Sequence, residues 1–232
     1  MSQRLSPLPG IDPATVCAVL APFLADDRRA RIDATVAARL GGLTLVIENL
    51  HDPHNGAAVL RSAEAFGLQA VHVVEASERF RFSADVTQGC EKWLDVERHA
   101  SFAAARARLH TAGFVLYGAV PDATTSWEEL DFDRPAAIVV GNEHAGLSDA
   151  AIAGVDRSFA IPMAGMTRSL NLSVAAAVVV AHAARRRRHG LGRDGDLDEA
   201  ACLRLRARFY TASVRGATQI LERHRATWRR AT

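Results

Sequence analysis

The feature that most constrains the fold is a repeated alternation of short apolar runs with helix-like segments, which begins at residue 43. Leu43–Glu48 and Ala136–Val140 are almost wholly apolar, as expected of parallel strands that are buried on both faces. Further strand-like runs lie at residues 70–75, 113–118 and 159–161, and helical spacing covers residues 54–66 and 102–111. This alternation predicts an α/β fold with a mostly parallel, doubly wound sheet.

The two ends of the chain lack strand-like runs and are expected to be helical. Helical spacing covers residues 13–24 and 26–40, with Asp12 placed to cap the first helix and Pro13 at its first position. A Gly- and Asp-rich break at 190–198 precedes a second helical stretch, interrupted by Gly216. The expected domains are 1–42 (N-terminal helical extension), 43–188 (α/β domain) and 189–232 (basic C-terminal helical extension).

The net charge of +2 conceals an asymmetry along the chain. From Arg185 onward there are thirteen arginines and five acidic residues, whereas the preceding part has fifteen basic and twenty-one acidic residues. A segment of net charge +8 attached to a body of −6 is the pattern expected for a polyanionic partner such as RNA. Lys92 is the only lysine, so the arginine count also fits a compositional bias that has no bearing on function.

Several protein classes are disfavoured. Cys17, Cys90 and Cys202 are far apart and have no metal-ligand or redox spacing, so they are expected to be free thiols in a reducing compartment. No secretory signal is visible, and the most apolar stretch, residues 172–184, is interrupted by Ser173 and His182 and is too short to cross a bilayer. A cytoplasmic protein without a membrane partner is expected. The Gly-x-Gly-x-x-Gly string at 190–195 follows a helix rather than a strand, which argues against a dinucleotide site.

The first informative stretch is Glu48-Asn-Leu-His-Asp-Pro-His-Asn-Gly-Ala-Ala-Val-Leu-Arg61, which leaves the carboxyl end of the first strand. Open α/β sheets bind ligands at that edge. Asn55 is placed to cap the following helix, and Arg61 is expected about one and a half turns further on, on a similar side. By itself such an arginine is usually part of a solvated surface or an ion pair. The stretch predicts a site without specifying its chemistry.

Two later stretches also join a strand to a helix through a Gly-containing polar loop. In the first, residues 139–148, Gly141 permits close approach of the backbone to a ligand, Glu143 is the single acid, and Ser148 is placed to cap the next helix. The second runs from residue 161 to 177 and feeds a long apolar helix that starts at Ser169 or Asn171. Ser169 lacks the Gly-x-Ser-x-Gly setting of a nucleophile, so a cap or a ligand contact is expected.

In order and spacing, the three stretches resemble the three motifs of the SpoU/TrmH family of SPOUT RNA 2′-O-ribose methyltransferases. The patterns that carry the resemblance are Asn49-x-His-x-Pro-His-Asn-x-x-Ala-x-x-Arg61 and Gly165-Met-x-x-Ser-Leu-Asn-x-Ser-Val-Ala. It covers about residues 43–188 and extends loosely into both flanks. The resemblance implies a deep trefoil knot in the C-terminal part of the sheet domain and a homodimer that packs through the knot region.

The resemblance also implies a cofactor and a set of site residues. S-adenosylmethionine is expected in the knot loops, bound by Ala119, Val120, Gly141, Ile161, Met163, Gly165, Ser169 and Leu170. Arg61 is expected to activate the ribose 2′-hydroxyl, with Asn55, Glu143, Ser169 and Asn171 arranging the site. Because a guanidinium is a very weak base, Arg61 could instead grip a substrate phosphate while His54 or water takes the proton.

The expected partner is RNA, and tRNA in particular. Arg168, Arg185 and Arg187 are the expected RNA contacts, whereas Arg186 and Arg188 could be solvated surface. The first expectation for the target is the guanosine at position 18 in the tRNA D-loop. The alternatives are another tRNA or rRNA ribose, or a non-catalytic RNA-binding protein that retains the fold.

Overall fold

The computed structural model describes residues 10–76 and 89–231, with side chains to residue 225. Its contacts divide the described chain into two compact units. One is a sheet unit of residues 40–194, and the other is a helical unit made of residues 10–39 together with 195–231. The first and last segments of the chain therefore belong to one body.

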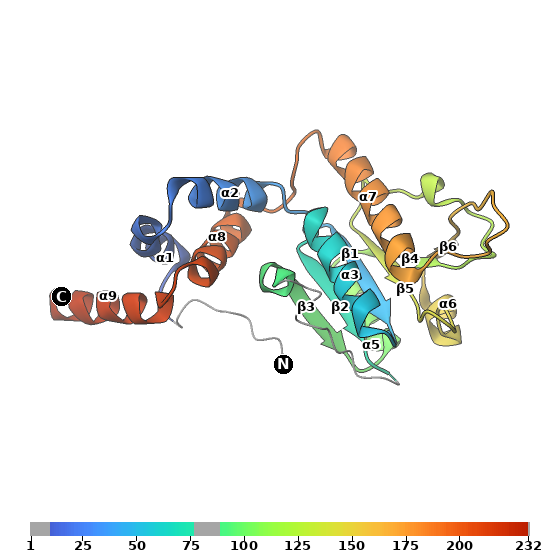
Figure 1. The fold of residues 1–232 in the computed structure, drawn as a ribbon, viewed down its shortest axis with the longest axis horizontal. Helices are drawn as coiled ribbons and strands as arrows, with labels where there is room; N and C mark the ends of the chain where they lie inside the picture. The colour runs from blue at the N-terminus through green and yellow to red at the C-terminus, as the bar shows by residue number, and fades with distance from the viewer. Residues whose placement is uncertain (1–9, 77–88, 232) are drawn as a thin grey trace. The chain divides into compact units, whose positions relative to one another are not determined.

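The sheet unit is built on six strands in the order β3-β2-β1-β5-β4-β6, and every adjacent pair is parallel (Figure 1). The strands are β1 Leu43–Glu48, β2 Ala70–Val74, β3 Asp95–His99, β4 Val115–Ala119, β5 Ala136–Val140 and β6 Arg157–Phe159. The helices are α3 Pro53–Ala65, α5 Phe102–Thr111, α6 Asp149–Gly154 and α7 Leu172–Leu191, with 3-10 turns η2 Cys90–Trp93 and η3 Trp127–Glu129. The predicted parallel α/β sheet is confirmed.

Helices cover both faces of this sheet. Successive residues of the central strands point to opposite faces, and because the residues on both faces are apolar, both faces must be covered. Leu45 and Ile47 of β1 lie in the core under α3 and α7, and those two helices pack against each other (Figure 1). Val46 points to the opposite face, into the core formed with α5 and α6. All six residues of β1 are buried. The strand is thus rigidly held at its carboxyl end, where the first motif begins.

The strand order places that carboxyl end at a switch point. From β1 the chain moves to β2 and β3 on one side, whereas β5 lies on the other side of β1, next to β4 and β6. β1 and β5 pair in register from Leu43 with Ala136 to Ile47 with Val140. The loops that follow these two strands, residues 49–52 and 141–148, therefore leave the sheet side by side, where doubly wound sheets bind ligands.

Most predicted elements are found, with local corrections. Leu43–Glu48, Ala136–Val140 and Phe102–Thr111 have the predicted bounds, but the last short strand lies at Arg157–Phe159 rather than at 159–161. Asp52, not Asn55, caps α3, because its carboxylate accepts a hydrogen bond from the His54 amide. Asp12 and Ser148 cap α1 and α6 as predicted.

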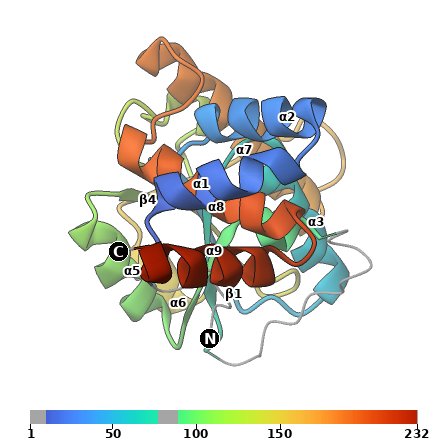
Figure 2. The ribbon, with the colours of Figure 1, turned by 90° about the vertical axis from the view of Figure 1, so that its left-hand side faces the viewer.

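The helical unit contains α1 Pro13–Leu20, η1 Ala21–Phe23, α2 Asp26–Ala37, α8 Glu199–Ser213 and α9 Ala217–Ala231. α8 packs against α1 and α2, and α9 against α1 and α8 (Figure 2). Its buried apolar side chains come from both chain segments and include Val16, Leu20, Leu205, Phe209 and Leu221. Arg206 Nε also lies 2.6 Å from Asp33 Oδ1. Among the described residues, no helix is long and apolar enough to span a membrane.

Candidate active site

The side chain of Glu143 connects the two loops at the switch point. Its carboxylate accepts hydrogen bonds from the backbone amides of His51 and Asp52, each at 3.2 Å, and from Asn55 Nδ2 at 3.0 Å. Asn55 Oδ1 in turn accepts a hydrogen bond from Asn171 Nδ2 at 3.2 Å. The structure thereby brings together three predicted catalytic residues from the three motifs.

This environment keeps Glu143 ionised. Partial burial raises the pKa of its carboxyl group, but the hydrogen bonds from Asn55 and from the backbone, including the amides of His51 and Asp52, outweigh that effect. The net pKa therefore lies below the ordinary value of 4.5. At neutral pH Glu143 is a hydrogen-bond acceptor that organises its neighbours, and it has no proton to donate.

The loop that carries Glu143 is held tightly at both ends. Asn142 and Gly146 bond to each other through their backbones at 2.8 and 2.9 Å, and Asn142 Nδ2 donates to Asn49 O. Only glycine fits at position 141, because an added Cβ would lie 2.1 Å from the carbonyl carbon of Gly146. At the far end, the buried carboxylate of Glu48 accepts hydrogen bonds from the amide and hydroxyl of Ser148. The loop has little freedom to move.

A cavity of about 270 Å³ opens beside this loop. Its wall comes from the ends of β4 and β5, from β6, and from the loop that leads into α7. It is lined by Ala119, Val120, Pro121, Val140, Gly141, Asn142, Glu143, His144, Gly146, Phe159, Ala160, Ile161, Met163, Arg168, Ser169, Leu170, Leu172 and Ala175. The lining is largely small or apolar, and its polar side chains are those of Asn142, Glu143, His144, Arg168 and Ser169.

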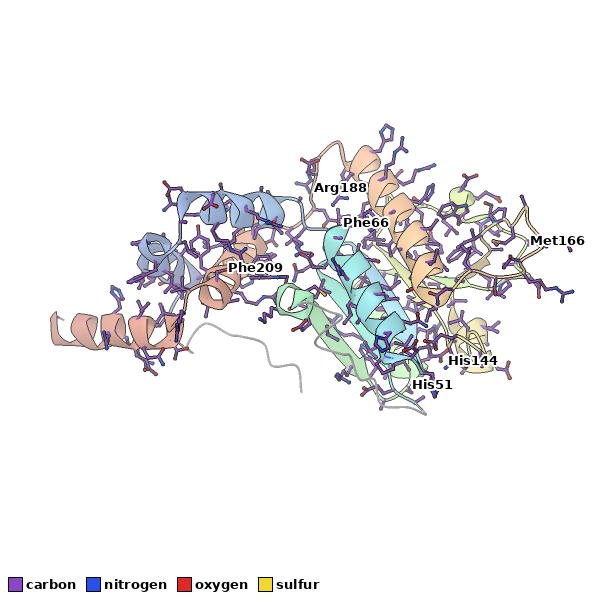
Figure 3. All side chains as sticks on the ribbon, viewed as in Figure 1. His51, Phe66, His144, Met166, Arg188 and Phe209 are labelled. Atoms are coloured by element: carbon purple, nitrogen blue, oxygen red, sulfur yellow. The ribbon has the colours of Figure 1, made fainter. Side chains whose placement is uncertain are left out.

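Seven of the eight residues expected to bind the cofactor line this cavity; the exception is Gly165. Gly165 lies in the exposed loop between β6 and α7, whose tip at Met166 projects far from the sheet (Figure 3). Ser169 lines the cavity, and Asn171 caps α7 by accepting a hydrogen bond from the Ser173 amide. Asn171 therefore both starts the helix and contacts Asn55.

Arg61 does not join this network. Six residues advance an α-helix by about 600°, which leaves about 120° between Asn55 and Arg61, so the expectation that they share a side was wrong. Arg61 is exposed on α3, with no hydrogen-bond or ion-pair partner among residues 10–76 and 89–225. No hydrogen bond or ion pair within those ranges therefore occupies its guanidinium.

The expected RNA contacts have different environments. Arg168 and Arg185 are exposed, and Arg168 also borders the cavity. Arg187, by contrast, is 5% exposed and donates from Nη1 to the carbonyls of Phe132 and Arg134 at 3.1 and 2.9 Å. The expectation that Arg187 contacts RNA is therefore wrong, because its guanidinium is used within the sheet unit. Arg188 likewise donates to the carbonyl of Phe66, which lies beside it (Figure 3).

Some site residues were not expected from the sequence. His144 lines the cavity, and its ring centroid lies 6.2 Å from that of His51, so the side chains of two histidines lie close together here (Figure 3). Asn142 and Glu48 fix the loop, as described above. A buried acid at the last position of an apolar strand is the one signal in the sequence that could have identified Glu48.

Comparison with known proteins agrees with this geometry. The sequence pattern described as the SpoU rRNA Methylase family matches residues 42–181. The chain is 37% identical over 163 residues to the tRNA (guanosine(18)-2′-O)-methyltransferase of Escherichia coli (strain K12). The aligned region covers 70% of this chain and 71% of that protein.

Comparison with solved structures also finds SpoU enzymes. The crystal structure of the A. aeolicus TrmH/SpoU tRNA modifying enzyme superposes with a TM-score of 0.72 at 26% identity, covering 82% of this chain and 98% of that one. The SpoU methyltransferase AviRb from Streptomyces viridochromogenes, in complex with the cofactor AdoMet, has a TM-score of 0.58 at 25% identity and covers 66% of this chain and 62% of its own.

Proposed function

The chain belongs to the SpoU rRNA Methylase family of S-adenosylmethionine-dependent methyltransferases, and on that premise we propose that it methylates a ribose 2′-hydroxyl of tRNA. The family expected from the three motifs is confirmed. The proposed target is the guanosine at tRNA position 18, after the name of the Escherichia coli relative. The observation that carries the proposal is the network joining Asn55, Glu143 and Asn171 beside the cavity.

The cavity suits S-adenosylmethionine, which supplies the methyl group when bound. Small residues and glycine let the backbone itself form much of the wall, so amide and carbonyl groups can meet a polar ligand. The residues proposed to hold the cofactor are Ala119, Val120, Gly141, Ile161, Met163, Ser169 and Leu170. Glu143 belongs both to the wall and to the hydrogen-bond network, so the reaction is proposed to occur beside it.

In this arrangement the side chains of the network position the substrate. Glu143 is an ionised acceptor and holds the Asn55 amide in one orientation, while Asn171 fixes it from the other side. Arg61, which has no partner within the described chain, is proposed to grip a substrate phosphate and thereby orient the ribose hydroxyl for attack on the methyl group.

The path of the chain supports the proposed trefoil knot. β6 lies at the edge of the sheet, next to β4, yet α7 packs over α3 and contacts the central strands β1 and β5. The segment 160–171 must therefore return from the edge toward the centre. It does so beside residues 120–127, to which it is bonded from Ala160 N to Thr125 O and from Trp127 N to Ala160 O. We propose that this return threads the loop between β4 and β5.

A homodimer is proposed from the exposed apolar side chains near the cavity. Val174 and Val178 lie one helical turn apart on α7 and are 47% and 38% exposed. Met163, Met166 and Leu170, on the loop before α7, are exposed as well. Met163 and Leu170 also line the cavity, so Val174, Val178 and Met166 are the side chains proposed to pack against a second copy. The tRNA is proposed to bind at the exposed side chains of Arg168 and Arg185. The protein is proposed to act in the cytoplasm.

Methyl transfer to defined transcripts tests the function. The purified protein, with S-adenosylmethionine and an unmodified tRNA transcript, should yield one 2′-O-methylguanosine at position 18 by nucleoside mapping. A transcript with adenosine at that position should accept no methyl group there. Methylation only at another ribose, or only of rRNA, would replace the proposed substrate. Absence of transfer to any RNA despite S-adenosylmethionine binding would support the non-catalytic alternative.

A variant of Arg61 tests the mechanism separately. Arg61→Ala should leave S-adenosylmethionine binding by calorimetry unchanged, because Arg61 does not line the cavity. Turnover should fall by at least a hundredfold, since one lost charge-assisted contact in the transition state is worth about 3 kcal/mol. Arg106→Ala, which removes another exposed arginine, from α5, is the matched control. Near-normal turnover in Arg61→Ala would exclude the proposed role.

A further inference from the structure

A second group of convergent polar side chains lies away from the cavity, between β2 and β3. It consists of His72, Glu97 and His99, whose nearest ligand-type atoms all lie within 4.8 Å of one another. His72 Nδ1 is 2.9 Å from His99 Nε2 and 3.8 Å from Glu97 Oε2. Among the described residues, this is the one such group of three.

The backbone of the sheet brings these side chains together. Glu97 and His99 are two residues apart on β3, so they point to the same face of the strand. On the neighbouring strand, His72 is the register partner of Glu97. α5 packs against β2 and β3, and its Arg108 approaches Glu97 Oε2 to 3.5 Å. His72 is only 4% exposed, while Glu97 and His99 are partly open to solvent.

We propose that His72, Glu97 and His99 form a binding site for a divalent transition metal ion of the zinc type. Two imidazoles and a carboxylate are a known ligand set for such ions, with water in the fourth position. Tetrahedral bonds of about 2.0–2.1 Å separate neighbouring ligand atoms by about 3.3 Å. The separation of 2.9 Å falls below that value and the separation of 3.8 Å above it, so the imidazoles must rotate apart to take up an ion.

The two imidazoles already contact each other through a hydrogen bond, so one of the two facing nitrogens carries a proton. A metal ion binds imidazole through a nitrogen lone pair, so the ion would take the place of this proton. Arg108 opposes a second cation nearby, so moderate rather than very high affinity is expected.

The ion would stabilise the edge of the sheet. β3 is the outermost strand beyond β2, and all five of its residues are at least partly exposed. A metal ligated from both strands adds a link across this pair, which consists otherwise of backbone hydrogen bonds and a few side-chain contacts. Binding to the folded state alone raises stability in proportion to the logarithm of the metal concentration.

Cobalt and zinc titrations of the full chain, without an affinity tag, test the site. One equivalent of Co²⁺ should bind with the visible absorption of a tetrahedral ion, Zn²⁺ should displace it, and saturating Zn²⁺ should raise Tm by about 3 °C or more. His99→Gln and Glu97→Gln should each weaken Co²⁺ binding at least tenfold. The matched control is His110→Gln, because His110 also pairs with a carboxylate, Asp156, but lies outside the cluster.

Each outcome decides the proposal. Far-UV circular dichroism establishes that each variant is folded, and the wild-type titration stands even if one variant is not. Absence of a tetrahedral cobalt spectrum in the wild type would overturn the site, leaving His72 and His99 joined by an imidazole hydrogen bond. Equal loss of binding in His110→Gln would do the same, because it would identify a scattered surface effect.

Discussion

Glu143 shows how one side chain can organise a site without reacting. Its two oxygens accept three hydrogen bonds from two amides and Asn55. In Glu143→Gln, one oxygen becomes an NH₂ group that faces an N–H donor, so at least one bond is lost. Because hydrogen bonds to a charged group contribute about 1.5–3 kcal/mol, turnover should fall about 10- to 100-fold. Single-turnover methylation measures the loss; a wild-type rate in this variant would show that the network is dispensable.

The lowered pKa of Glu143 also predicts how stability depends on pH. A carboxyl group whose pKa is lower in the folded state stabilises the fold above its unfolded pKa, and loses that effect as the pH falls through the folded value. The contribution of Glu143 to the free energy of unfolding should thus be constant at pH 6–7. It should decline as the pH falls below 4.5, the ordinary pKa of a glutamate. Urea midpoints at pH 6 and pH 4 measure this. Glu143→Gln should show a smaller difference between them, and an identical one would contradict the assignment.

Two arginines of α7 are expected to have different roles, one in the stability of the fold and the other in RNA binding. Arg187→Ala leaves the carbonyls of Phe132 and Arg134 without their donor inside the sheet unit, so the free energy of unfolding should fall by about 2–4 kcal/mol. Arg185 is exposed, and Arg185→Ala should change stability by less than about 0.5 kcal/mol but weaken tRNA binding, most clearly at low salt. Urea unfolding and filter binding check both. A stable Arg187→Ala protein with weak tRNA binding would reverse this assignment.

At the scale of elements, the apolar pattern of the sequence was sufficient to predict those strands that are completely buried. β1 and β5 have the predicted bounds because both faces of each strand are covered, so every residue is apolar or nearly so. β3 was not predicted because Asp95–His99 is an edge strand that has three charged residues among five and no fully buried position. Its pairing with β2, and not its composition, makes it a strand. The cap of α3 was misassigned because Asp52 and Asn55 are both suitable residue types.

Gly141, which directly follows β5, is expected to be required for the conformation of the loop. In Gly141→Ala the added methyl group would overlap the backbone of Gly146 and Leu147, at 2.1–2.3 Å. Because backbone rather than a flexible side chain must move, the loop that carries Glu143 should shift. S-adenosylmethionine affinity should fall at least tenfold, and stability by about 1–3 kcal/mol. Gly165→Ala is the control, since its nearest neighbour would lie 3.9 Å away. Equal affinities in the two variants would argue against a rigid loop.

At the scale of the whole molecule, the topology decides which motifs meet. Asn55, Glu143 and Asn171 are up to 116 positions apart in the chain. Their polar loops could be predicted as sites, but only the strand order β2-β1-β5-β4 makes β1 and β5 neighbours. The resemblance to a known family identified all three residues, whereas the hydrogen bonds between them, and the burial of Arg187, depend on tertiary packing that no local pattern records.

The division into two units predicts that they can be perturbed separately. Phe209 is 2% exposed in the helical unit, and Phe209→Ala should cost about 3–5 kcal/mol through the cavity it leaves. That loss should reduce the helical signal of α1, α2, α8 and α9. S-adenosylmethionine binding should remain near normal, because every residue that lines the cavity belongs to the sheet unit.

Phe23→Ala makes the same chemical change at a side chain of the helical unit that is 57% exposed, so it should cost less than about 1 kcal/mol and leave the helical signal intact. Thermal unfolding by circular dichroism, with calorimetry of S-adenosylmethionine on the same samples, separates the two effects. If Phe209→Ala abolished cofactor binding along with the helical signal, the two units would be one cooperative body. Retained binding with weakened tRNA affinity would instead indicate that the helical unit serves recognition of the substrate.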